Sequence, residues 1–211
     1  MTAAARSEVT ALFWDIGGVI LSNGWGNAAR TRAVQHFEID REDLERRHAS
    51  AFPAFEMGQI TLAEYLDLVV FWRPQTFAKE EFTAFMFAQS SENAEARAVL
   101  DELTAARRYL LAAINNEGSE LNAYRITTFH LTRNFTAFFS SCYVGLRKPD
   151  ERIYRLALEV TQRKPEECLF IDDRPDNLEG ARRLGMRTIH FQTASQLRGD
   201  LANQGVSGAP A

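Results

Sequence analysis

Hydrophobic positions along the chain predict a series of short strands. Residues 9–14 form an apolar run that ends at Asp15 and is followed by Gly17 and Gly18, a pattern typical of a buried strand that breaks into a loop. Later apolar stretches predict four more strands, over residues 109–114, 138–144, 168–171 and 186–191.

The segments between the later strands have helical spacing. Residues 150–161 carry apolar side chains every three or four positions, and residues 175–184 begin with proline and end before Gly185, as helices prefer. Strands that alternate with helices predict a doubly wound, Rossmann-like α/β fold, in which helices cover both faces of a parallel sheet.

A purely helical pattern separates the first strand from the others. Within it, residues 61–64 form a capping box, and no strand is predicted. We therefore expect a helical cap domain at residues 23–91, inserted into a core domain of residues 1–22 and 92–211. The cap is rich in aromatic residues, which are expected to form its core or, alternatively, to face a ligand. The glycines of residues 22–26 suit a hinge, or a linker that simply packs around Trp25.

Composition narrows the function. Hydrophobic residues make up 45% of the 211 residues, charged residues 25%, and the net charge is −4, which argues against a disordered chain and against nucleic-acid binding. The longest apolar runs, residues 68–72 and 84–88, are too short to span a membrane. Cys142 and Cys168 cannot build a disulfide framework. We expect a cytoplasmic monomer or homodimer without membrane or nucleic-acid partners.

Polar residues follow four of the predicted strands, where parallel strands direct ligands into a common crevice. They are Asp15, the pair Asn115 and Asn116, Lys148, and the pair Asp172 and Asp173. Carboxylates brought this close require a cation, either the lysine or a hard metal ion. Mg²⁺ suits an oxygen-rich site that grips phosphate, and a spare carboxylate beside it can attack phosphorus.

These motifs resemble those of the haloacid dehalogenase superfamily, most closely its phosphatase-like members with a helical cap after the first strand. The resemblance spans about residues 9–192, and its four motifs fall at residues 14–20, 114–116, 147–150 and 170–177. It implies a hydrolase of small phosphorylated metabolites, such as sugar phosphates, acting through an aspartyl-phosphate on Asp15.

The resemblance also implies the roles of the other residues. Mg²⁺ would be held by the side chains of Asp15, Asp172 and Asp173 and by the backbone carbonyl of Gly17. Lys148 would neutralise the carboxylates and the transferring phosphoryl group. Asn177 would support the acidic pair.

Two positions depart from the phosphatase pattern. Gly17 stands where an aspartate normally donates a proton to the leaving oxygen, and loss of such a group typically costs a factor of ~10²–10⁴. A good leaving group, or a proton from water or from the cap, would compensate. The serine or threonine expected after the second strand is replaced by Asn115; a shift of one residue would place Ile114 or Asn116 there, and only an asparagine amide can replace the hydroxyl donor.

Two other functions remain open at this point. In a metal-independent 2-haloacid dehalogenase, Asp15 would attack carbon, but such an enzyme has no need for the adjacent acids Asp172 and Asp173. Alternatively, the changes at Gly17 and Asn115 indicate a module that binds phosphate ligands without turning them over. The four histidines lack the spacing of metal ligands, and we expect no role for them.

Overall fold

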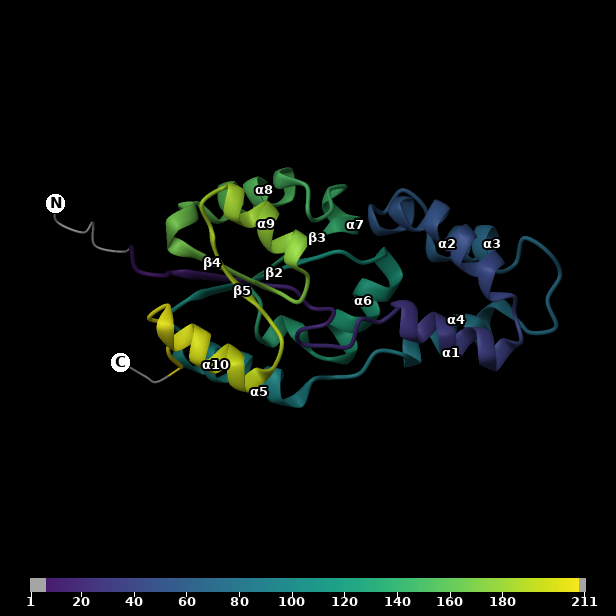
Figure 1. The fold of residues 1–211 in the computed structure, drawn as a ribbon, viewed down its shortest axis with the longest axis horizontal. Helices are drawn as coiled ribbons and strands as arrows, with labels where there is room; N and C mark the ends of the chain where they lie inside the picture. Colours follow the sequence, from purple (N-terminus) through teal and green to yellow (C-terminus); the bar gives the residue numbers. More distant parts are fainter. Residues whose placement is uncertain (1–6, 209–211) are drawn as a thin grey trace.

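The five strands form one parallel sheet, in the order β3-β2-β1-β4-β5 (Figure 1). A computed structural model describes residues 7–208; the outermost residues of the expected core domain, 1–6 and 209–211, lie outside the described part. The strands are β1 (Ala11–Trp14), β2 (Leu110–Asn115), β3 (Ala137–Ser140), β4 (Cys168–Asp172) and β5 (Arg187–His190). Trp14 pairs with Ala113 on one side and with Ile171 on the other, so the strands after which Asp15, Asn115 and Asp172 fall end at one edge.

Helices cover both faces of this sheet, which confirms the doubly wound α/β prediction (Figure 1). On one face, Phe13 and Phe170 pack with the buried side chains of two helices, and on the other Leu12 and Ile171 pack with those of another two. The helices are α8 (Glu151–Thr161) and α9 (Pro175–Arg183) on the first face and α5 (Ala94–Ala106) and α10 (Ala194–Asn203) on the second. Side chains alternate along a strand, so β1, buried on both faces, requires a continuous apolar run.

Four helices lie between β1 and α5 and project from one end of the sheet (Figure 1). They are α1 (Asn27–Phe37), α2 (Arg41–Glu56), α3 (Leu62–Val69) and α4 (Lys79–Ala88). The predicted capping box is present at the start of α3, where Thr61 and Glu64 bond to each other's backbone. Most aromatic side chains of this unit form its own core, with Trp25 and Phe82 at a ring distance of 5.6 Å.

One predicted strand was partly wrong. The apolar stretch 138–144 continues as a strand only to Ser140, and α7 (Ser141–Val144) is a short helix that ends at Gly145, which has a φ of 66°. A short apolar run does not distinguish a buried strand from a buried helical turn. The remaining elements are α6 (Ser119–Thr128) and the 3₁₀ turns η1 (Leu131–Arg133) and η2 (Pro165–Glu167).

The helical unit formed by α1–α4 packs closely against the sheet edge. The ring of Phe55 lies against Gly118, where a Cβ atom would come within 2.0 Å of it. The Ser141 hydroxyl donates to the Glu56 carbonyl at 2.6 Å, and the Leu62 amide donates to the Glu120 carboxylate at 2.9 Å. These contacts place the end of α2 directly over the sheet edge that carries the acidic residues.

The structure also bears on two expectations from composition. Cys142 and Cys168 are free thiols, and burial raises the pKa of each, to about 11 and about 12, which suits structural rather than reactive cysteines. Across residues 7–208, none of the helices has both the length and the apolar character needed to cross a membrane.

Candidate active site

Three carboxylates meet at the carboxyl edge of the sheet. Asp15 follows β1 and Asp172 ends β4, and these two strands are neighbours. Together with Asp173, each offers an oxygen within 4.8 Å of the others. Asp15 is 7% exposed and Asp172 is fully buried, so the sheet edge concentrates negative charge where little water can screen it.

Lys148 supplies positive charge to this cluster. Its Nζ lies 2.9 Å from Oδ1 of Asp15 and 2.6 Å from Oδ2 of Asp172, and the residue is 2% exposed. The side chain of Asn116 holds the lysine backbone from both sides, because its amide donates to the Lys148 carbonyl at 2.9 Å and its oxygen accepts from the Lys148 amide at 2.9 Å. Asn116 therefore fixes the position from which the lysine reaches the carboxylates.

One lysine does not balance three carboxylates. Burial, reinforced by Asp172 and Asp173, raises the pKa of Asp15 to about 8, although Lys148 lowers it. Burial and the neighbouring Asp172 also raise the pKa of Asp173. Burial alone would lower the pKa of Lys148, but Asp15 and Asp172 raise it. The fold thus holds excess negative charge that a further cation would stabilise.

The donor atoms fit a hard divalent cation. Oδ1 of Asp173 is buried and accepts no hydrogen bond from any residue of the described part of the chain, which is costly unless an ion or water meets it. Gly18, with a φ of 79°, lies so close that a Cβ atom would be 2.2 Å from Oδ2 of Asp173. Asp172 is fixed by Asn177, whose amide nitrogen lies 3.0 and 3.1 Å from its two oxygens.

The two asparagines after β2 point in different directions. The Asn115 amide donates to Asn122 at 2.9 Å, and its oxygen accepts from Ser140 at 2.8 Å in the protein interior. Asn115 is 2% exposed and does not line the cavity, whereas Asn116 does. The expected contact of Asn115 with a phosphoryl group is not supported by these contacts, because its side chain is already used inside the core.

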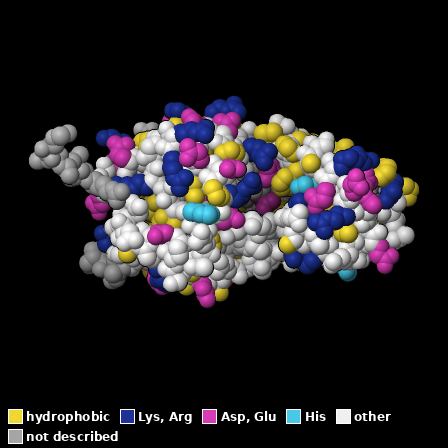
Figure 2. All heavy atoms as spheres, in the orientation of Figure 1, with side chains coloured by type: hydrophobic (Ala, Val, Ile, Leu, Met, Phe, Trp, Pro, Cys, Tyr) yellow, Lys and Arg dark blue, Asp and Glu magenta, His cyan; other side chains and the backbone are white. Residues whose placement is uncertain are grey.

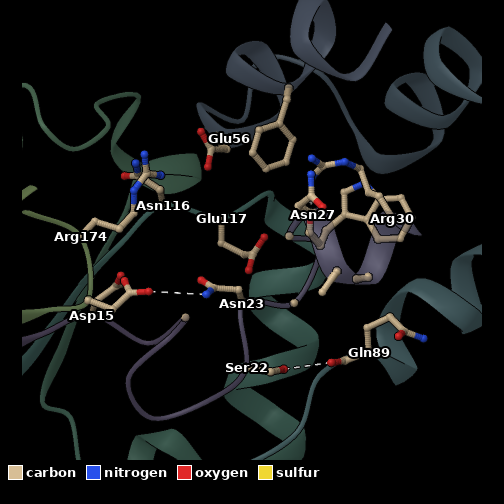
Figure 3. A pocket seen from close by; sticks show the side chains of 18 of the residues that line it. Asp15, Ser22, Asn23, Asn27, Arg30, Glu56, Gln89, Asn116, Glu117 and Arg174 are labelled. Carbon is tan, nitrogen blue, oxygen red and sulfur yellow. Dashed lines mark hydrogen bonds between the residues drawn. The ribbon is translucent and has the colours of Figure 1, made fainter. Parts of the chain in front are cut away.

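A cavity of about 870 Å³ opens between this sheet edge and the helical unit. Figure 2 shows a hollow at the junction of the two parts, with acidic side chains in its depth. Asp15, Gly17, Lys148 and Asp173 line its inner end. In Figure 3, Glu56 projects from α2 toward the side on which Asp15 lies. The cavity is much larger than a phosphate group and has room for an organic substrate.

Several charged residues of this cavity were not anticipated from the sequence. Glu117 and Arg125 form a buried ion pair at 2.5 Å and are 5% and 3% exposed. Glu56, at the end of α2, lies 2.7 Å from Arg147. Glu117 could have been singled out, because it directly follows Asn116 at a strand end. The others occur in helical or loop segments whose charges look like those of any solvated surface.

His48 also lines the cavity, although no role was expected for it from the sequence. Tyr65 accepts a hydrogen bond from the Trp25 ring nitrogen at 2.8 Å, so its own proton points to Nδ1 of His48 at 2.7 Å. Burial, with Arg30 nearby, lowers the pKa of His48 to about 4. The ring is therefore neutral, with its proton on Nε2.

Glu56 gives a prediction for the pH dependence of stability. Burial raises the pKa of the Glu56 carboxyl to about 7, and the negative charge of Glu117 acts in the same direction. The positive charges of Arg147, Arg174 and Lys148 oppose this shift, with Arg147 the strongest of the three. The native protein therefore holds an extra proton between about pH 4.5 and 7, and its stability falls as pH rises through this window. This loss amounts to up to about 3 kcal/mol in the free energy of unfolding, and we expect it to be absent in Glu56→Gln.

Urea unfolding of the wild type and of Glu56→Gln, measured from pH 4.5 to 8, tests this expectation. The difference in the free energy of unfolding between the two proteins should change across the window and level off above it. Glu80→Gln removes an exposed acid and serves as the control. Parallel curves for wild type and Glu56→Gln would contradict the prediction.

Known proteins resemble this chain in sequence and in fold. The family model of haloacid dehalogenase-like hydrolases matches residues 9–185. The chain is 28% identical to drimenol cyclase drtB of Aspergillus calidoustus, over 96% of this chain and 37% of that protein. It is 26% identical to phosphatase MT3486 of Mycobacterium tuberculosis, over 90% of this chain and 91% of the phosphatase.

Among solved structures, the HAD family enzyme bt-2542 of Bacteroides thetaiotaomicron, in complex with magnesium and inorganic phosphate, superposes with a TM-score of 0.74. The sequences are 21% identical, and the match covers 90% of this chain and 98% of that one. The chain spans 37% or less of the length of the first curated relatives it matches. The family model covers most of the sequence, so the chain belongs to the haloacid dehalogenase-like hydrolase family.

Proposed function

We propose that this hydrolase is a Mg²⁺-dependent phosphatase of small phosphate monoesters that uses Asp15 as its nucleophile. The observation that carries the proposal is the carboxylate cluster at the base of the cavity, in which Lys148 is outnumbered and the buried Oδ1 of Asp173 has no partner within residues 7–208. The name of the phosphatase relative and the magnesium and phosphate bound in bt-2542 support the same chemistry.

Asp15 is prepared for attack by its hydrogen bonds. Its Oδ1 accepts from the Ile16 amide at 2.8 Å and from Lys148 at 2.9 Å, whereas Oδ2 has no hydrogen-bond partner among the described residues. Oδ2 would form a bond to phosphorus while the bond from phosphorus to the leaving oxygen breaks. Water would then hydrolyse the aspartyl-phosphate, which releases inorganic phosphate and restores the carboxylate.

The surrounding residues would hold the charge that this exchange moves. Lys148 would stay protonated and face the phosphoryl oxygens, while Asn116 keeps its backbone in place. The side chains of Asp15, Asp172 and Asp173 and the Gly17 carbonyl would hold Mg²⁺, which when bound supplies positive charge to the phosphoryl group.

The helical unit would position the substrate and exclude water. Its residues His48 and Phe52, both on α2, line the cavity. Their rings lie 4.3 Å apart, and the neutral His48 offers one N–H donor to a polar acceptor. This combination suits a small phosphorylated metabolite with both polar and apolar surface.

An assay of phosphate release tests the proposal. The purified protein is incubated with a panel of sugar phosphates and an activated aryl phosphate, with Mg²⁺ and with EDTA. We expect release that depends on Mg²⁺. Halide release from a 2-haloacid without metal would instead establish a dehalogenase. Phosphate binding without release from any substrate would indicate a non-catalytic module.

A further inference from the structure

The space beside Gly17 is occupied by an arginine. In the typical phosphatase of the superfamily that this chain resembles, an aspartate at this position donates a proton to the leaving oxygen. Here the backbone of Gly17 lies outside the left-handed region, so its conformation does not require glycine. A Cβ atom built on Gly17 would lie 3.6 Å from Nη1 of Arg125 and 3.6 Å from Oδ1 of Asn23. The guanidinium of Arg125 thus lies in van der Waals contact with the place that a Cβ atom at position 17 would take.

Arg125 is held firmly in this place. It reaches from α6 to the cavity, and its Nη1 donates to Oε2 of Glu117 at 2.5 Å, while Nη2 donates to the Ser22 carbonyl. Gly24, with a φ of 51°, passes so close that a Cβ atom would be 3.2 Å from Nη1. A buried guanidinium with three fixed neighbours loses little side-chain freedom when it binds a substrate.

The guanidinium still has unused donors. An arginine carries five N–H groups, of which the Glu117 and Ser22 contacts use one on Nη1 and one on Nη2. The second N–H group of each of these two atoms has no partner in these contacts. Because Arg125 lines the same cavity as Asp15, a substrate oxygen is a partner that the cavity can bring to these Nη donors.

We propose that Arg125 is a catalytic residue that hydrogen-bonds the leaving oxygen of the substrate, with Glu117 as its positioning residue; this inference rests on the proposed phosphatase function. When the bond from phosphorus to the leaving oxygen breaks, the electron pair stays on that oxygen. Arg125 stabilises the negative charge there but keeps its own protons, since a guanidinium is not deprotonated in proteins. Water then protonates the released alkoxide or phenoxide.

A substrate class follows if the cationic Arg125 acts in place of a proton-donating aspartate at position 17. Stabilisation without proton transfer is sufficient for leaving oxygens that carry negative charge readily, and insufficient for those of simple alcohols. The favoured substrates are therefore phosphate monoesters whose leaving oxygen is more acidic than that of a simple alcohol, such as aryl or enol phosphates. This narrows the broader class of sugar phosphates that the family resemblance implies.

The test is the dependence of kcat/KM on leaving-group acidity. Wild type and the double variant Arg125→Met/Glu117→Gln, which removes both charges of the pair, are assayed with Mg²⁺ on a series of aryl and alkyl phosphates. For the wild type we expect kcat/KM to fall steeply as the pKa of the leaving group rises. The double variant should lose about 10²-fold on the least acidic leaving groups and only a few-fold on the most acidic aryl phosphate.

Arg97→Met is the matched control. Arg97 is also a mostly buried arginine, paired with Asp101 at 3.0 Å, but it does not line the cavity. Its variant should lower stability without changing the slope of the leaving-group series. If the double variant does not fold, Arg125→Lys keeps the charge and should show a smaller loss with the same preference.

The possible results distinguish the proposed role of Arg125 from the proposed phosphatase function. An equal loss over the whole series in the double variant would show that Arg125 is structural, and would overturn this inference while leaving the phosphatase intact. A basic limb in the wild-type pH profile that disappears in Glu117→Gln would show that Glu117 donates a proton, and would also overturn it. No phosphate release by the wild type from any member of the series would overturn both.

Discussion

Replacing Asp15 with asparagine is expected to lower phosphate release in saturating Mg²⁺ by about 10⁴-fold or more, the order of loss when a covalent nucleophile is removed. The asparagine amide has nearly the shape of the carboxylate but cannot attack phosphorus. Asp15 is 7% exposed, and its Oδ1 accepts from Ile16 and Lys148. The variant should retain the fold, because the amide oxygen can still accept these hydrogen bonds.

The measurement combines steady-state release with mass spectrometry of acid-quenched protein. The wild type should show a phosphorylated peptide that contains Asp15, and the variant should not. Asp176→Asn is the matched control, because Asp176 is an exposed acid next to the same cluster in sequence and does not line the cavity. Substantial activity in Asp15→Asn would rule out this residue as the nucleophile and with it the proposed aspartyl-phosphate.

The placement of the acidic cluster could be predicted from the sequence, because parallel topology constrains it. A strand buried on both faces leaves only its ends for polar residues, and all the strands of a parallel sheet end at the same edge. Asp15 and Asp172 come together because β1 and β4 are adjacent in the sheet. Lys148 was also identified, since the excess of carboxylates calls for a cation at that edge.

The orientation of individual side chains at a strand end could not be predicted in the same way. Asn115 is the last residue of β2 and pairs with Ser140, so its side chain joins the interior network. Asn116 has left the strand and its side chain reaches Lys148. Successive side chains of a strand point to opposite faces, so a boundary displaced by one residue exchanges the two roles.

Residues contributed by the helical unit were missed for a different reason. His48 and Glu56 lie on α2, where their spacing is that of an ordinary amphipathic helix. They become part of the cavity only because α2 docks on the sheet edge through Phe55 and Gly118. Such docking depends on shape complementarity between distant segments, and one sequence carries no direct signal for it. Arg125 was missed likewise, since nothing in α6 predicts that its side chain fills the space beside Gly17.

Replacing Lys148 with methionine is expected to lower the free energy of unfolding in EDTA by about 3–5 kcal/mol, as when one partner of a buried ion pair is removed. Lys148 is 2% exposed and lies within 2.9 Å of Asp15 and 2.6 Å of Asp172. Without it, the buried carboxylates repel one another unless they bind protons. The pKa of Asp15, which burial already raises, should rise further without the lysine, so the destabilisation should grow as pH increases.

Urea unfolding with and without Mg²⁺ provides the decisive comparison. If Asp15, Asp172 and Asp173 form the metal site, Mg²⁺ should restore part of the stability of Lys148→Met, because a ligand that binds only the native state stabilises it. The exposed Lys164→Met should behave like wild type. A variant as stable as wild type in EDTA would contradict the electrostatic role of Lys148. A variant that is destabilised but unaffected by Mg²⁺ would confirm that role while arguing against a metal site in these three carboxylates, since a cation there would replace the charge that the lysine provided.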